Sequence, residues 1–218
     1  MAKKEETSQN KIRDKYIEYV LEFDNTPKSV FKFAKDNGFT EKEFYNYYSS
    51  FEMLEKEIFN ELATETIKAL EKSKEYEQYE VRNKLLSFYF TFFENLTANR
   101  SFVVYALHKD KHQLKSLKVL SKLRETFIHY IQSLNIETID LKSEKLQKVK
   151  SKVIEESAWI QLLMTMKFWL DDTSSGFEKT DIFIEKSVNV SFDLIDSTPL
   201  KGIVDFGKFL YKEKVNMK

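Results

Sequence analysis

The sequence predicts an all-α protein, and three observations lead to this fold class. The 218 residues include only four glycines and two prolines, which favours long helices over the many turns of a sandwich or barrel. Apolar residues recur at steps of three and four along most of the chain, the period of a helix with one buried face. Helix start signals, in which Ser or Thr precedes Glu by three residues, occur near the N-terminus. With 42% hydrophobic and 15% aromatic residues, the chain can bury a sizeable core.

The first helix is expected over about residues 11–23, after a polar tail. A second, short helix is expected to start at Thr26, as its N-cap, with Pro27 at the first helical position, where a missing N–H costs nothing. Asn37 and Gly38 end it, because glycine tolerates the left-handed conformation after a helix.

A third helix is expected immediately afterwards. Thr40 and Glu43 have the spacing of a capping box, and the inward face consists of Phe44 with either Tyr47 or Tyr48. A helix, a glycine-containing turn and a second helix make a helix-turn-helix, whose second helix can enter the major groove of DNA.

The remaining elements are also expected to be helices. Ser49 and Glu52 form a second capping box, from which a helix starts at Phe51 and runs to about residue 74, followed by a charged connection over 75–80. The apolar residues around positions 158–170 predict burial on more than one side. The later helices are expected over residues 81–97, 102–107, 109–134, 143–170, 180–195 and 197–215.

Residues 11–60 resemble the N-terminal domain of the TetR family of transcriptional regulators. The residues that carry this resemblance are Ala34, Gly38, Phe39, Thr40, the run Phe44-Tyr45-Asn46-Tyr47-Tyr48 and the helix start Ser50-Phe51-Glu52-x-Leu54. The resemblance implies a DNA-binding head over residues 1–50 and a helical body over 51–218 that binds a ligand and dimerises.

The resemblance further implies a homodimer formed by helices at about 144–171 and 180–196. Its two recognition helices would lie about 34 Å apart on a palindromic operator. A ligand in the body would shift the helix over 51–74 and release the DNA, provided that its affinity differs between the two states.

The charges of the head bear on DNA binding. Residues 1–50 carry nine basic and nine acidic side chains, so affinity for phosphates requires the charges to segregate. The resemblance assigns phosphate contacts to Tyr45 and Tyr47, but Phe51 replaces a family lysine, and Glu41 and Glu43 stand in the recognition helix. The alternative is a helix-turn-helix that only packs against the body. The residues expected to contact DNA are Lys28, Thr40, Glu41, Lys42, Tyr45, Asn46 and Tyr47.

The body is expected to hold an apolar pocket between helices, for an apolar or aromatic small molecule or a lipid. The same side chains would also suit an ordinary core, and the resemblance to ligand-responsive proteins favours the pocket. A rival interpretation is a TetR-shaped protein that has lost DNA binding and carries a lipid or isoprenoid, as the TetR-like lipid-binding proteins of ubiquinone biosynthesis do. The pocket candidates are Phe88, Tyr89, Phe92, Phe93, Phe102, Tyr105, His112, Trp159, Met164 and Phe168.

An enzyme is not expected, because no phosphate-binding loop, nucleophile elbow or zinc-protease motif occurs. His108 and His112 share a helix face but lack a third ligand, which favours two ordinary polar residues over a metal site. No cofactor or metal is expected. The absence of cysteine, of an apolar signal segment and of a long apolar run predicts a cytoplasmic protein without a membrane span. The amphipathic residues 200–212 either dock on the body or meet lipid.

Overall fold

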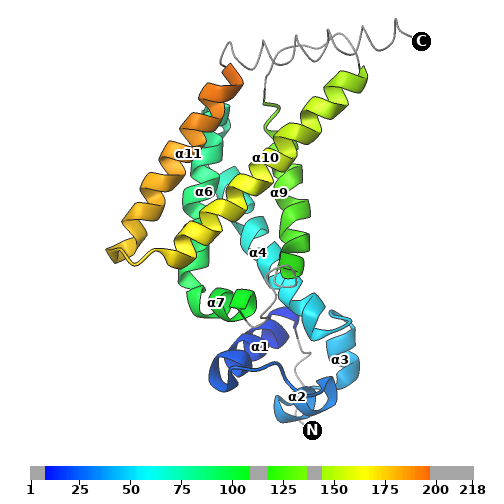
Figure 1. Ribbon diagram of the computed structural model, residues 1–218. Helices are drawn as coiled ribbons and strands as arrows, with labels where there is room; N and C mark the ends of the chain where they lie inside the picture. The colour runs from blue at the N-terminus through cyan, green and yellow to red at the C-terminus, as the bar shows by residue number, and fades with distance from the viewer. Residues whose placement is uncertain (1–7, 109–116, 137–143, 197–218) are drawn as a thin grey trace, which may run out of the picture. The chain divides into compact units, whose positions relative to one another are not determined.

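Every regular element in the described part of the chain is helical, which confirms the all-α class (Figure 1). The computed structural model describes residues 8–108, 117–136 and 144–196, without the side chains of 144–150, 195 and 196. None of the described helices is long and apolar enough to span a membrane. The elements are α1 (Gln9–Phe23), α2 (Val30–Asp36), α3 (Glu41–Tyr45), α4 (Phe51–Glu71), α5 (Lys74–Gln78), α6 (Val81–Ala98), α7 (Arg100–His108), η1 (Leu117–Leu120), α9 (Ser121–Ser133), α10 (Glu144–Asp171), η2 (Ser175–Phe177) and α11 (Glu178–Asp196).

The start of α2 differs from the expectation. Ser29 is its N-cap, and the Ser29 Oγ accepts a hydrogen bond from the Lys32 N–H at 3.2 Å. The hydroxyl of Thr26, the expected cap, instead lies 3.2 Å from the hydroxyl of Tyr105 on α7. A tertiary contact therefore uses the side chain that the local pattern assigned to helix capping.

Two further local expectations are wrong. The helix α4 begins where expected, but its cap is Ser50 rather than Ser49, because the Ser50 Oγ accepts from the Met53 N–H at 3.2 Å. The expected connection over 75–80 contains the short helix α5. Tyr76 anchors this helix, since its side chain is buried and its hydroxyl lies 2.8 Å from that of Tyr130 on α9.

The helix α11 begins before Thr180, its expected cap. Asp172 organises this start. Its carboxylate accepts hydrogen bonds from the N–H and hydroxyl of Ser174 at 2.8 and 2.7 Å, and from those of Thr180 at 2.9 and 2.7 Å. Burial raises the pKa of Asp172, but these four hydrogen bonds outweigh burial and hold the pKa at about 2.

The expected helix over 109–134 is described only from residue 117. Its described part consists of the 3-10 helix η1 followed by α9, while residues 109–116 lie outside the described ranges. The helix expected over 197–215 also lies outside them.

The chain divides into two compact units. The first comprises Met1–Ala69 and Thr91–Phe127, and the second comprises Leu70–Phe90 and Ile128–Lys218. This division follows the packing of the chain. The predicted division at residue 50, between a DNA-binding head and a ligand-binding body, concerns function and remains a prediction.

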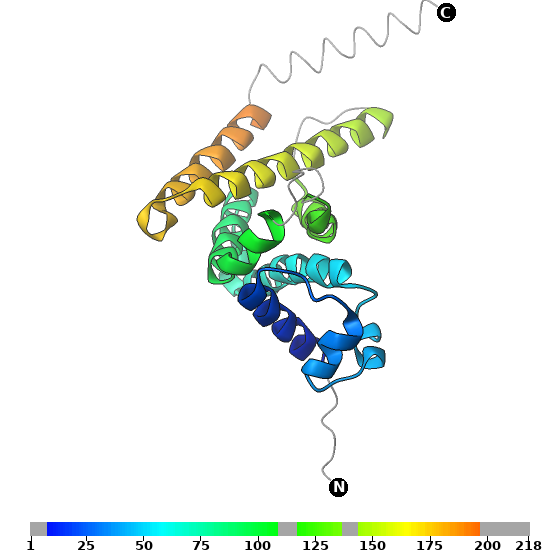
Figure 2. The same ribbon diagram turned by 60° about the horizontal axis from the view of Figure 1, so that its bottom comes forward.

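In the first unit, α1, α2 and α3 lie beside the start of α4 (Figure 2). Aromatic rings join these helices. Tyr16 of α1 contacts Phe33 of α2 edge-on at 6.2 Å between ring centroids, and Phe33 contacts Phe44 of α3 at 6.4 Å. All three side chains are at most 1% exposed. Because α3 has only five residues, this packing and its caps fix its position, rather than its intrinsic helix stability.

In the second unit, α10 and α11 run antiparallel to each other (Figure 1). Each helix turns one apolar face inward, which the buried side chains Leu162, Met166, Trp169, Ile184, Val188 and Phe192 define.

Candidate nucleic-acid interface and ligand-binding region

The turn between α2 and α3 has the geometry that the sequence predicts. Gly38 has a φ of +74°, and a Cβ there would meet no atom within 4 Å. Glycine is therefore favoured by the backbone conformation and not by lack of space. The Phe39 N–H bonds to the Ala34 carbonyl at 3.0 Å, which closes the end of α2 and directs the chain into α3.

The predicted capping box at the start of α3 is present. The Glu43 carboxylate accepts from the Thr40 N–H at 2.6 Å, and the Thr40 Oγ1 accepts from the Glu43 N–H at 3.2 Å. The Glu43 carboxylate thus lies against the N-terminal end of its own helix, where a negative charge is favourable. Glu43, one of the two acidic residues of the recognition helix, therefore has a structural role as part of its cap.

Side-chain burial distinguishes an inward from an outward face along α3 and the turn that follows it. Phe44 and Tyr48 are at most 2% exposed, so Tyr48 is the inward residue that the sequence left open. Tyr45 is 53% and Tyr47 43% exposed. Of the residues expected to contact DNA, Glu41 is half-buried, and the exposed ones are Lys28, Thr40, Lys42, Tyr45, Asn46 and Tyr47.

Phe51, which stands where the family resemblance implies a lysine, packs in the aromatic core of the head. Its ring stacks on Tyr16 at 5.3 Å, and meets Phe33 and Phe44 edge-on at 5.4 and 5.3 Å. The position that would carry a phosphate-binding cation therefore completes the aromatic core of the head.

Hydrogen bonds tie α4 to α1 within the first unit. The Glu55 side chain, 1% exposed, accepts from the Tyr16 hydroxyl at 2.5 Å, and Arg13 pairs with Glu61 at 2.7 Å. Burial, and then the neighbouring Glu55 charge, raise the pKa of Tyr16, so its hydroxyl stays a donor. Glu55 was not predicted from the sequence, although it lies four residues after Phe51 and three before Ile58, on the apolar face of the helix.

The structure buries most of the expected pocket residues, and they are distributed over both units. Phe92, Phe93, Phe102 and Tyr105 belong to the first unit. Phe88, Tyr89, Trp159, Met164 and Phe168 belong to the second. His112 lies outside the described residues, Met164 is 59% exposed, and the others are buried except for the half-buried Phe168. The aromatic pocket remains a prediction.

Part of α10 and α11 exposes apolar side chains. On α10 they recur at steps of seven and four, and on α11 at steps of eight and four, so each set follows one helical face. A groove of about 390 Å³, lined by residues that include Met164, Phe168 and Phe183, lies on the same pair of helices. These exposed residues, each 50–59% accessible, are Val153, Ile160, Met164, Ile182, Val190 and Leu194.

This chain is similar to a family model and to a solved structure. The family model described as the tetracyclin repressor-like, C-terminal domain matches residues 84–210, which is more than half of the chain. The crystal structure of a candidate TetR family transcription regulator from Shewanella sp. PV-4 matches with 13% identity and a TM-score of 0.47, over 85% of this chain and 96% of that chain. No curated protein matches. On the family-model match, this chain belongs to the TetR family of transcriptional regulators.

Proposed function

We propose that this protein binds operator DNA as a homodimer, acts as a repressor and is released from DNA by an apolar small molecule. The observation that carries the DNA-binding part is the exposed face of α3. Lys42 and Tyr45 are exposed on α3, which buried rings and a reciprocal cap hold in place, and Asn46 and Tyr47 are exposed in the turn that follows it. A lysine, tyrosines and an amide can contact phosphates, and lysine and asparagine can also contact base edges.

The homodimer would form through α10 and α11. Monomeric proteins rarely expose large contiguous apolar patches, and the six exposed apolar residues of these helices lie on one antiparallel pair. In a two-fold interface the same patch would cover itself on the partner. Two heads at fixed spacing would then meet two half-sites of a palindrome.

The ligand would enter an apolar region of the body. The buried Phe92, Phe93 and Phe102, which belong to the same unit as most of α4, supply aromatic surface of the kind that lines small-molecule sites. A ligand that binds one arrangement of α4 better than another would change the affinity of the heads for DNA. Such a regulator would act in the cytoplasm, where it meets its operator.

One observation favours the rival function, a lipid carrier without DNA binding. Phe51 occupies the core of the head in place of a cation, which removes one phosphate contact that the family resemblance implies.

The experiment is a fluorescence-anisotropy titration with DNA from the protein's own promoter region over a series of salt concentrations. Binding should weaken linearly on a log–log plot against salt, and Lys42→Ala should reduce the slope by about 1 if Lys42 neutralises one phosphate. Lys72→Ala, which removes an equal charge from an exposed site beyond α4, is the matched control. Absence of DNA binding at low salt would contradict the proposed repressor function and favour the lipid carrier.

A further inference from the structure

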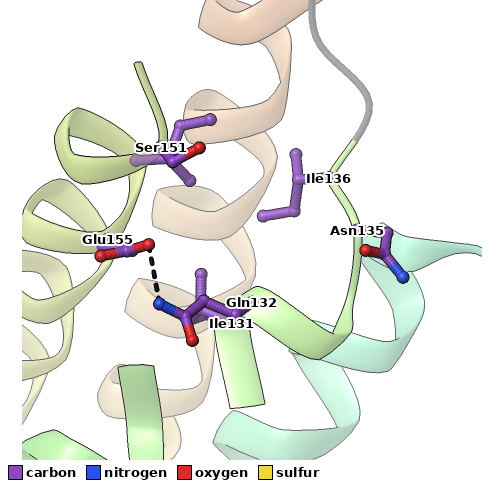
Figure 3. Close-up of a pocket in the computed structure, with 7 residues that line it drawn as sticks. Ile131, Gln132, Asn135, Ile136, Ser151 and Glu155 are labelled. Carbon is purple, nitrogen blue, oxygen red and sulfur yellow. Dashed lines mark hydrogen bonds between the residues drawn. The ribbon is translucent and has the colours of Figure 1, made fainter. Parts of the chain in front are cut away.

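A cavity of about 500 Å³ lies in the second unit, at the end of α9 (Figure 3). Ser151 and Glu155 of α10 lie on one side of it, and Asn135 and Ile136, which follow α9, lie on the other. Its volume falls within the range of small-molecule sites. None of its described lining residues belongs to the set of pocket candidates predicted from the sequence.

The described lining combines three isoleucines with four polar residues, of which Glu155 is the acidic one. Ile131, Ile136 and Ile154 provide the apolar surface. The carboxylate of Glu155 accepts a hydrogen bond from the Gln132 Nε2 at 2.9 Å (Figure 3). Within the described residues, no lysine or arginine pairs with Glu155.

A carboxylate beside isoleucine side chains favours one chemical class of ligand. An anion would be repelled, and a neutral apolar molecule would cover the carboxylate without compensating its lost hydration. A protonated amine would provide both a counter-charge and hydrogen-bond donors to Glu155, while an apolar body covers the isoleucines. We propose that this cavity binds an amphipathic amine, with its ammonium group on Glu155.

The test is isothermal titration calorimetry of the purified full chain with n-octylamine, which is cationic at neutral pH. Octan-1-ol and octanoate supply the same apolar body with no charge and with a negative charge. The amine should bind more tightly than the alcohol, and octanoate should bind least.

Variants locate the site. Glu155→Gln keeps the shape and removes the charge, so it should weaken amine binding about tenfold or more and leave octanol binding unchanged. Glu156→Gln, at the exposed neighbour on α10, is the matched control and should change neither. Trp159, one helical turn beyond Glu155, provides a second measurement, because its fluorescence should respond to the amine.

The proposal is overturned if octylamine does not bind, if it binds no better than octanol, or if Glu155→Gln binds it as tightly as the unchanged chain. The measurement contains no DNA, so its outcome is independent of whether the head binds an operator.

Discussion

Removing the Tyr16 hydroxyl should destabilise the first unit measurably. Tyr16 is fully buried, and its hydroxyl donates to the 1% exposed carboxylate of Glu55 at 2.5 Å. Hydrogen bonds to charged groups contribute about 1.5–3 kcal/mol, and a buried carboxylate that loses a donor keeps its desolvation cost. We therefore expect Tyr16→Phe to lower the free energy of unfolding by about 2 kcal/mol, and the melting temperature by about 4–8 °C for a chain of this size.

The assay is urea and thermal unfolding followed by circular dichroism. Tyr45→Phe removes the same hydroxyl from a 53% exposed residue, and should change stability by less than about 0.5 kcal/mol. In a double-mutant cycle with Glu55→Gln, the coupling energy should lie above about 0.5 kcal/mol. If Tyr16→Phe were as mild as Tyr45→Phe, the buried bond would not support the junction of α1 and α4.

Three further predictions concern other parts of the chain. Ile160→Glu should convert a dimer of twice 26.0 kDa into a monomer in light scattering, whereas Leu21→Glu, at an exposed leucine of α1, should not. Asp172 has a folded pKa of about 2 against an ordinary 3.8, so its stabilisation is present above about pH 4 and is lost as the pH falls toward 2. Asp172→Asn should remove that part of the pH dependence in urea melts at pH 7 and pH 3. Gly38→Ala should cost about 1 kcal/mol in the same melts, because alanine is strained at a φ of +74°; no loss would show that the turn adapts.

The head could be predicted from local sequence because its signals act over a few residues. The capping box of Thr40 and Glu43 and the left-handed Gly38 require only their immediate neighbours. The cap of α2 could not be predicted, because Thr26 is engaged by Tyr105, 79 residues away. The helix α5 was missed for the same reason, since Tyr76 is anchored by Tyr130, 54 residues away.

The candidate sites were predictable to different degrees. The outward position of Tyr45 follows from helical periodicity once Phe44 is inward. The packing of Phe51 could not be foreseen from the family pattern, because its partners come from three helices. The cavity at Glu155 joins α10 to the end of α9, and sequence spacing does not show which carboxylate lies beside which isoleucines.

The most direct test of the central claim is a nuclease footprint on the promoter region of the protein's own gene. A homodimer that carries two α3 helices should protect two symmetric half-sites about 10 base pairs apart, centre to centre. Tyr45→Ala should weaken protection at both half-sites, since a phosphate contact acts uniformly across sequences. Protection that is unchanged by Tyr45→Ala and Lys42→Ala, or no protection at low salt, would contradict the account.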